Sequence, residues 1–433
     1  MIFEPGLETI PRGELWTLQL GRLRALVAYV KERVPLYSER LADVEPDDIG
    51  ELEDLSRLPF TRKDDLRDTY PLGMLATPRD ELARIHASSG TTGKPVVVAY
   101  TAADLDLFAR MNARTLAMGG AEPGMMLHNA YGYGLFTGGL GLHDGGECLG
   151  LTVVPVSGGM TERQLTLIED LRPEVISCTP SYALTLGHAF AERGVAPDEI
   201  SLRFALVGAE PWTENMRREI DASLGVRCTN LFGLSEVIGP GVSCECVEER
   251  SGSHVNEDHF LPEIVDPESG EPLPEGDEGV LVFTTLTKQA LPLVRYWTGD
   301  ICSLSTAPCS CGRTLVRMGQ IVGRSDDMLI IRGVNVYPSQ VGAVLGRVPE
   351  LSPHFGLVVR RQGTLDEVEV LAEPRRDVFV SLTDERVREL SERTAALIRD
   401  TIGCTMAVTL VGAGEAPRSD GGKIQRITDL RSA

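Results

Sequence analysis

Apolar residues recur with two periods along this chain, and these periods predict where helices and strands lie. Residues 14–36 carry apolar positions at helical spacing until Pro35 ends the run, which predicts a helix. Thr61 precedes a charged stretch and is expected to cap a second helix. Farther along, amphipathic segments alternate with short apolar runs. We predict helices at 102–118, 161–171, 181–193 and 213–224, a glycine-rich helix-like stretch ahead of residue 152, and strands at 125–129, 152–156, 174–178, 203–207 and 227–231.

This alternation of strand and helix is typical of an α/β fold. It predicts a largely parallel sheet that is covered by helices on both faces. From about residue 253 to 324 the pattern changes to short strands and turns, with strands expected at 278–284 and 292–296. We therefore expect a small β-rich subdomain after the parallel sheet.

A second unit is expected to begin near Asp326. Its pattern predicts a hairpin across residues 332–334, a short helix after Pro338, strands near 355–361, 367–372 and 405–411, and a helix at 384–401. The sequence thus predicts a large N-terminal domain over 1–325, with its β-rich part over about 240–324, and a small α+β C-terminal domain over 326–433.

Composition and charge narrow the class of protein. The chain has 433 residues and a formal net charge of -21, whereas a nucleic-acid-binding surface needs a basic face. Small anions such as nucleotides remain open, because local donors hold them. We find no apolar run of the roughly 20 residues that span a bilayer and no leader, so we expect a cytoplasmic protein. Its nine cysteines should then be thiols or metal ligands.

A loop of hydroxyls and glycines at residues 88–94 is the first candidate site. Apolar runs at 83–87 and 96–100 flank it, so the loop is expected to be the turn of a hairpin. Its glycines, its four hydroxyls and Lys94 can aim donors at a polyanion such as a phosphate chain. The spacing and the following Pro95 differ from a Walker loop. An ordinary polar hairpin tip remains the alternative. The loop residues are Ser88, Ser89, Gly90, Thr91, Thr92, Gly93 and Lys94.

Several later segments resemble, in order, the phenylacetate–CoA ligase family of adenylate-forming enzymes. They span most of the chain and include Gly208-Ala209-Glu210-Pro211 and Phe232-Gly233-Leu234-Ser235-Glu236. The other matching segments are 88–94, 131–139, 257–260, 323–336 and 422–423. The resemblance implies the adenylate-forming fold and a ligase that converts an aromatic carboxylic acid to acyl-AMP with ATP and then to a CoA thioester.

The resemblance also implies roles for residues that contact ATP. Lys94 and the rest of the hydroxyl loop would hold the departing phosphates, and Glu236 would bind Mg²⁺. Asp300 resembles the aspartate that binds ribose, and Arg324 resembles an arginine that contacts ribose or phosphate. Trp297 stands where the family usually has arginine, which leaves the local shape open. The remaining nucleotide contacts would come from Gly208, Ala209, Glu210, Pro211, Phe232 and Gly233.

Three residues of the second unit would act in turn. Asp326 resembles the hinge about which a mobile C-terminal unit rotates, although an isolated Ser-Asp-Asp would only begin a turn. Lys423 resembles the lysine that bridges the substrate carboxylate and the α-phosphate. Gly333 would let the pantetheine arm of CoA pass, and a glycine needed only for the turn is the alternative.

The acid is expected to lie against residues 131–146. Its pocket would be lined by Tyr133, Phe136, Gly139, Asp144, Ile238 and Pro240. Asp144 stands where phenylacetate ligases usually have tyrosine. A buried carboxylate needs a donor, so Asp144 favours anthranilate or a hydroxybenzoate over phenylacetate if it faces the ring. The alternative is that Asp144 points to solvent or to an internal partner.

Two Cys-x-Cys pairs flank the β-rich region. Thiolates and imidazole form the tetrahedral ligand set of structural Zn²⁺. By resemblance to some family members, the ligands would be Cys246, His254, Cys309 and Cys311, with Cys244 spare. A loop of reduced thiols is the alternative.

Two other functions stay open at this point. A ligase of this kind can pass its acyl group to the pantetheine arm of a carrier protein instead of free CoA. A scaffold that binds nucleotide without catalysis would lack Lys94, Glu236, Asp300 or Lys423, and all four are present. A homodimer is also open, and no membrane or nucleic-acid partner is expected.

Overall fold

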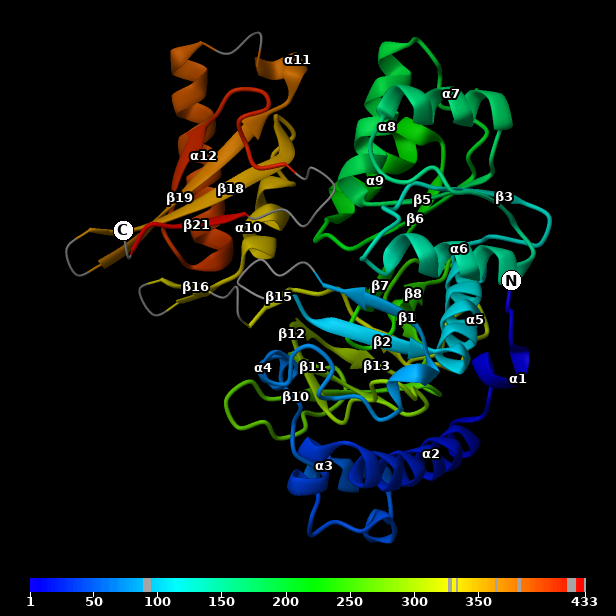
Figure 1. Cartoon of the computed structure of the whole chain (residues 1–433). Helices are drawn as coiled ribbons and strands as arrows, with labels where there is room; N and C mark the ends of the chain where they lie inside the picture. The colour runs from blue at the N-terminus through cyan, green and yellow to red at the C-terminus, as the bar shows by residue number, and fades with distance from the viewer. Residues whose placement is uncertain are drawn as a thin grey trace. The chain divides into compact units, whose positions relative to one another are not determined.

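The chain packs as two units in a computed structural model (Figure 1). The structure describes residues 1–88, 95–325, 329–331, 334–362, 365–379, 383–418 and 426–431. The first unit comprises Met1–Ala209 and Ser223–Gln320, and the second comprises Glu210–Ala222 and Ile321–Ala433. Each unit is described by itself below.

A nine-stranded sheet forms the centre of the first unit, in the order β13-β14-β9-β8-β7-β6-β5-β3-β4. The strands from β4 to β7 are parallel, which confirms the predicted parallel sheet. The strands beyond β7 are antiparallel. Their bounds are β3 Met126–Asn129, β4 Thr152–Val154, β5 Val175–Cys178, β6 Phe204–Gly208, β7 Arg227–Leu234, β8 Gly239–Glu245, β9 Ser253–Val255, β13 Leu304–Ser305 and β14 Arg317–Met318.

Helices cover both faces of the parallel strands, as predicted. Figure 1 shows α5 (Ala102–Met118) and α6 (Gly138–Leu149) on one side and α7 (Thr161–Leu171) and α8 (Pro180–Glu192) on the other. Glycines let α6 approach α5 closely, since a Cβ atom at Gly145 would lie 2.3 Å from Asn112 Cβ. The glycine-rich stretch is therefore a helix whose neighbour leaves no room for side chains at these positions. The helix predicted at 213–224 is α9 (Glu214–Leu224).

The short strands of the β-rich part are shared between two sheets. β9, β13 and β14 extend the large sheet, while β10 (Phe260–Val265), β11 (Gly279–Thr285) and β12 (Tyr296–Cys302) form an antiparallel group. The strand predicted at 292–296 is wrong, because β12 begins only at Tyr296. Arg295 has φ of +46°, which an extended strand cannot accommodate.

The N-terminal segment folds as several helices. These are α1 (Pro5–Glu8), α2 (Arg12–Arg33), α3 (Pro35–Arg40) and α4 (Lys63–Asp68), with short 3₁₀ turns at Pro46–Asp48, Leu52–Arg57 and Arg79–Glu81. Pro35 ends the long helix as predicted and starts α3. Thr61 is not a cap, because its hydroxyl donates to Val294 O at 2.6 Å and Arg62 takes the cap position. Among the described helices, none is both long and apolar enough to cross a bilayer.

The hydroxyl loop joins an antiparallel hairpin, which confirms its expected setting. β1 (Leu82–Ala87) pairs with β2 (Val97–Thr101). Ser88 N–H donates to Val96 O at 2.9 Å and closes the base of the hairpin.

The second unit has its own sheet and core. Strands in the order β20-β19-β18-β21 pack their apolar side chains with those of two helices. The parallel pairing of β21 with β18 was not predicted, because three residues carry too little pattern. The elements are β15 Gly323–Arg324, β16 Leu329–Ile331, β17 Val334–Val336, α10 Pro338–Leu345, β18 Leu351–Gln362, β19 Leu365–Pro374, α11 Arg376–Phe379, α12 Asp384–Ile402, β20 Ala407–Leu410 and β21 Ile427–Asp429.

A buried ionic network ties the N-terminal helices to the sheets of the first unit. Asp258, which lies in the turn before β10, accepts two hydrogen bonds from Arg114 of α5 at 2.8 and 3.0 Å. Arg22 of α2 donates to the Asp258 carbonyl. Next to it, His259 is buried and its Nδ1 lies 2.7 Å from Thr287 Oγ1. The segment 257–260 therefore anchors the structure of this unit, because the charge of Asp258 is paired inside it.

Burial of His259 should make the stability of the protein depend on pH. Burial lowers the pKa of His259 to about 3, against the attraction of Asp258. An unfolded histidine has a pKa of about 6.5, so between these values the unfolded chain binds a proton that the folded chain does not. The contribution of neutral His259 to the free energy of unfolding should therefore be fully present above a pH of about 6.5 and should decrease as the pH falls below that value. His259→Gln removes this contribution, and urea unfolding at a pH of about 7.5 and of about 5 measures it.

We expect the wild type to lose about 2 kcal/mol more than His259→Gln between these two pH values. Exposed His188→Gln is the matched control and should follow the wild type. Equal losses in the wild type and His259→Gln would contradict the assignment.

Candidate functional site

A tight turn between β7 and β8 carries Glu236. The N–H groups of Val237 and Ile238 both donate to Leu234 O at 3.1 Å, which closes the turn. Gly233 is required beside it, because a Cβ atom there would lie 1.9 Å from Gly239 O. The Glu236 side chain is largely buried, and Lys63 Nζ lies 3.9 Å from Glu236 Oε1. The turn therefore holds an acidic side chain in a position where it can bind a cation.

The predicted adenine segment ends strand β6. Gly208 pairs with Leu231 of β7, and a Cβ atom at Gly208 would lie 2.1 Å from Leu231 O. Ala209 follows with φ of +69°, a strained conformation that is enriched at ligand sites. Phe232 stacks on Phe283 with ring centroids 6.4 Å apart. An aromatic face thus lies next to backbone at the carboxyl ends of parallel strands, where α/β sheets bind ligands.

Three of the predicted segments meet in the first unit. Tyr131 OH donates to Gly208 O at 3.2 Å, and Thr137 Oγ1 lies 3.4 Å from Ser235 Oγ. These contacts join residues 131–139 to the end of β6 and to the turn that carries Glu236. Segments that are far apart in the sequence therefore form one region.

Asp300 lies on the neighbouring group of strands. It is buried on β12, and its N–H donates to Thr298 Oγ1 at 3.0 Å. β12 pairs with β11, whose Phe283 stacks on Phe232. The pairing of β11 and β12 thus joins the strand of Asp300 to the strand that stacks on Phe232.

The candidate acyl pocket contains a fixed tyrosine. Asn129 Nδ2 donates to Tyr133 OH at 2.7 Å and to Gly139 O at 2.8 Å. The Tyr133 hydroxyl also lies 3.1 Å from His143 Nδ1. Burial raises the pKa of Tyr133 to about 12, so the phenol stays protonated and can donate to His143. Ile238 and Pro240 are buried, whereas Phe136 is 47% exposed.

Asp144 has a partner within the protein. Its Oδ2 accepts a hydrogen bond from Arg84 of β1 at 2.7 Å. The inference that Asp144 needs a donor from the substrate loses its support, because Arg84 supplies that donor. No pattern in the sequence indicated this pairing, since the two residues are 60 positions apart.

Several predicted residues cannot be placed against this region. Ser89–Lys94, Asp326, Gly333 and Lys423 lie outside the described residues. Ser88 is described, and its hydroxyl oxygen accepts from Val96 N at 3.3 Å. Glu210, Pro211 and Arg324 belong to the second unit. Their contacts with nucleotide remain predictions.

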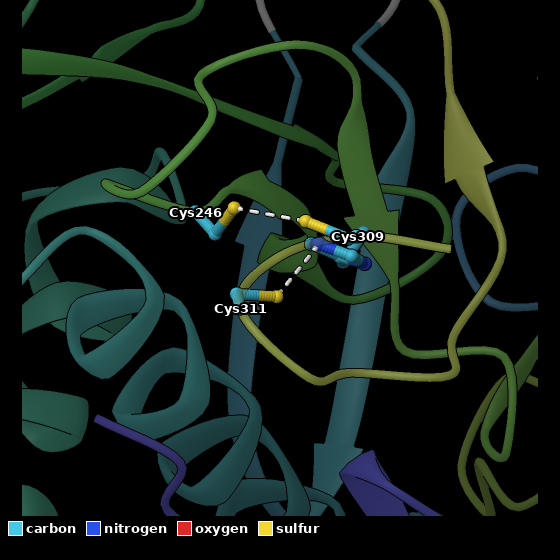
Figure 2. A group of neighbouring side chains, drawn as sticks. Cys246, Cys309 and Cys311 are labelled. Atoms are coloured by element: carbon cyan, nitrogen blue, oxygen red, sulfur yellow. Dashed lines mark hydrogen bonds between the residues drawn. The ribbon is translucent and has the colours of Figure 1, made fainter. Parts of the chain in front are cut away.

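Four predicted metal ligands lie together in the first unit. The ligand atoms of Cys246, His254, Cys309 and Cys311 are all within 4.8 Å of one another. Figure 2 shows the three cysteines pointing toward a common point. Cys246 Sγ lies 3.5 Å from Cys309 Sγ, and Cys311 Sγ lies 3.4 Å from His254 Nε2. Ligands of one tetrahedral zinc lie about 3.5–4 Å apart, so these residues fit Zn²⁺.

The histidine of the cluster is oriented to coordinate a metal. His254 Nδ1 lies 3.3 Å from Leu315 O, and a carbonyl can only accept, so Nδ1 carries the proton and Nε2 is free to coordinate. The hydrogen bond from Cys246 lowers the pKa of the Cys311 thiol against the effect of burial, whereas the pKa values of the Cys246 and Cys309 thiols are raised. Cys244 is buried outside the cluster, and its Sγ donates to Glu245 O at 3.3 Å.

The sequence did not identify Lys288. It lies in a polar stretch that is typical of a solvated loop, yet it is 2% exposed and its Nζ donates to Glu236 O at 3.0 Å. Only the three-dimensional contact with the turn marks it as part of this site.

Comparison with known proteins agrees with these features. Residues 39–286 of the chain match the protein family described as AMP-binding enzyme, and residues 333–431 match the family described as AMP-binding enzyme C-terminal domain. It is 62% identical to a phenylacetate-coenzyme A ligase of Thermus thermophilus, with 100% of each chain covered. It is 48% identical to the protein of that name from Escherichia coli, with 98% of this chain and 97% of the relative covered.

A solved structure is similar along the chain. A crystal structure of 2-hydroxyisobutyryl-CoA ligase in the postadenylation state, in complex with 2-HIB-AMP, matches with a TM-score of 0.92 and 26% identity. The match covers 99% of this chain and 92% of that one.

Proposed function

The chain belongs to the phenylacetate–CoA ligase family of AMP-binding enzymes, and we propose that it joins phenylacetic acid to coenzyme A through an acyl-adenylate. As a member of that family it is an ATP-dependent acid–thiol ligase. The observation that carries the proposal is the meeting of residues 131–139, Gly208 and the Glu236 turn in one region. An acid pocket and a nucleotide slot must share such a region for their ligands to react.

The reaction has two displacements. An oxygen of the substrate carboxylate attacks the α-phosphorus of ATP, and pyrophosphate leaves. The CoA sulfur then attacks the acyl carbon, loses its proton and expels AMP. Phe232 and the backbone of Gly208 and Ala209 would hold the adenine, and Asp300 would accept from the ribose hydroxyls. Glu236 would hold Mg²⁺, which neutralises phosphate charge when bound.

Phenylacetate is favoured over amino- and hydroxybenzoates by the contacts of Asp144. A carboxylate that is already paired with Arg84 has no need of a donor on the ring. Such a substituent would have to compete with a charged hydrogen bond, which is stronger than a neutral one. The name of the relatives at 62% and 48% identity supports the same acid.

A panel of acids tests this function. With ATP, Mg²⁺ and CoA, pyrophosphate release should be at least about tenfold more efficient in kcat/KM with phenylacetate than with anthranilate or 2-hydroxybenzoate, as the loss of one pocket interaction implies. AMP and the thioester should form with free CoA. A preference for anthranilate would contradict the assignment of phenylacetate as the acid. Faster transfer to a holo-carrier protein than to CoA would contradict the assignment of CoA as the acyl acceptor.

We also propose that Lys423 serves the first half-reaction alone. Lys423→Ala should lower pyrophosphate release by about two to three orders of magnitude, as expected for loss of one preorganised charge. Thioester formation from supplied phenylacetyl-AMP should persist. Arg418→Ala is a matched control, because Arg418 pairs with Glu373 at 2.6 Å within the second unit. If Lys423→Ala lowered the rates of both half-reactions equally, Lys423 would not serve the first half-reaction alone.

Finally, we propose that Cys246, His254, Cys309 and Cys311 bind one structural Zn²⁺. Four protein ligands leave no position open for a substrate, so the metal would stabilise the β-rich region and take no part in catalysis. The close approach of the four ligand atoms supports this proposal.

Zinc content and thermal stability test the metal site. Purified protein should contain about one Zn²⁺ per chain, and Cys246→Ser should lose it together with several degrees of thermal stability. Cys244→Ser, which changes a neighbouring thiol outside the cluster, should retain both. Wild-type protein without zinc, or equal zinc in both variants, would refute the site.

A further inference from the structure

Buried side chains hold the backbone that follows Glu236. Residues 236–241 form the turn and the start of β8, and four of their carbonyl oxygens accept hydrogen bonds from side chains of distant segments. The donors are Lys288 Nζ to Glu236 O at 3.0 Å, Tyr100 OH to Ile238 O at 2.9 Å, Asn112 Nδ2 to Pro240 O at 3.0 Å and Asn256 Nδ2 to Gly241 O at 2.8 Å. We call these four donor residues the carbonyl anchors.

The carbonyl anchors take the place of a regular strand ladder. β8 pairs with β7 at Gly239 and Leu234, and the pairing resumes only at Ser243 and Phe232, with an irregularity between. Gly239 and Gly241 have φ of +102° and +99°, so the chain there is not extended. Buried carbonyl groups need donors, and side chains provide them where the ladder is interrupted.

Lys288 differs from the other carbonyl anchors because it carries a charge. Its ammonium group is buried and lies 5.0 Å from the centre of the Tyr100 ring. Asp104 attracts this charge and fixes the adjacent backbone, since its carboxylate accepts from Gln289 N at 2.7 Å and from Ala290 N at 2.8 Å. Burial lowers the pKa of Lys288 to about 8, while Asp104 and Glu236 favour its charged form.

An apolar side chain would fill this space without the penalty of burying an ammonium group. The charge therefore calls for an explanation beyond packing. Lys288 both donates to the backbone of Glu236 and attracts its carboxylate. The first contact fixes the turn, and the second is an attraction between opposite charges that an apolar side chain would not supply.

We propose that Lys288 is a positioning residue that holds Glu236 in the geometry required to bind the divalent cation of the reaction. This inference rests on the proposed function of Glu236. Lys288 acts through Glu236 and makes no contact of its own with substrate. Tyr100, Asn112 and Asn256 hold the rest of the segment without adding charge.

The test is the Mg²⁺ concentration that gives half-maximal pyrophosphate release at saturating ATP and phenylacetate. Lys288→Met removes the charge and the donor with little change in shape, and it should raise this concentration by about tenfold and lower kcat, with the KM for phenylacetate within about twofold. Lys288→Gln keeps a donor without the charge and should give an intermediate increase. Tyr100→Phe is the matched comparison, because it removes a carbonyl bond farther along the segment but no charge, and it should change the Mg²⁺ requirement less than Lys288→Met does.

The outcomes separate this role from simple packing. A lower melting temperature in Lys288→Met with an unchanged Mg²⁺ requirement would overturn the proposal and leave a structural lysine. If Lys288→Met does not fold, Lys288→Gln decides in the same way. Glu236→Gln, measured alongside, tests the premise: an unchanged Mg²⁺ requirement there would overturn the role of Glu236, and with it the proposal, while acid-dependent pyrophosphate release in the wild type would still support the ligase function.

Discussion

A buried carbonyl group must find a donor, and the turn between β7 and β8 meets this constraint with side chains. The strand ladder is interrupted after Glu236. The carbonyl oxygens there accept hydrogen bonds from side chains elsewhere in the first unit, namely Lys288, Tyr100, Asn112 and Asn256. The turn is thereby fixed to α5, to β2 and to the segment ahead of β10. The role proposed for Glu236 requires such rigid support, because small displacements weaken positioned electrostatic contacts.

Charges in the first unit are paired before any substrate arrives. Arg114 and Asp258 join α5 to the segment ahead of β10, and Arg84 and Asp144 join β1 to α6. The second pair includes Asp144, which was predicted to line the acid pocket, and it supplies the donor that an isolated carboxylate needs. The proposed preference for phenylacetate rests on this pair. The four residues of the thiol and imidazole cluster likewise come together from segments that are far apart in the chain.

Much of the fold could be predicted from the sequence because its elements are long and periodic. The bounds of α5 and α7 agree with prediction. The wrong predictions have local causes. The Thr61 hydroxyl donates to the carbonyl oxygen of Val294 and does not cap a helix. Arg295 has a positive φ, so the chain turns where apolar residues predicted a strand. Motif resemblance drew attention to Glu236 and to the four residues of the Cys/His cluster, whose ligand atoms lie together in the structure. It could not find Lys288 or the partner of Asp144, because such contacts depend on how distant segments pack.

In the proposed reaction the substrate carboxylate attacks the α-phosphorus of ATP. Isotope transfer measures this directly: the enzyme is supplied with phenylacetate labelled with ¹⁸O in its carboxylate, together with ATP, Mg²⁺ and CoA, and the products are weighed by mass spectrometry. We expect the AMP formed to carry one ¹⁸O atom and pyrophosphate to carry none. If phosphate or pyrophosphate carried the label and the nucleotide did not, the carboxylate would have attacked another phosphorus, and attack at the α-phosphorus would be contradicted.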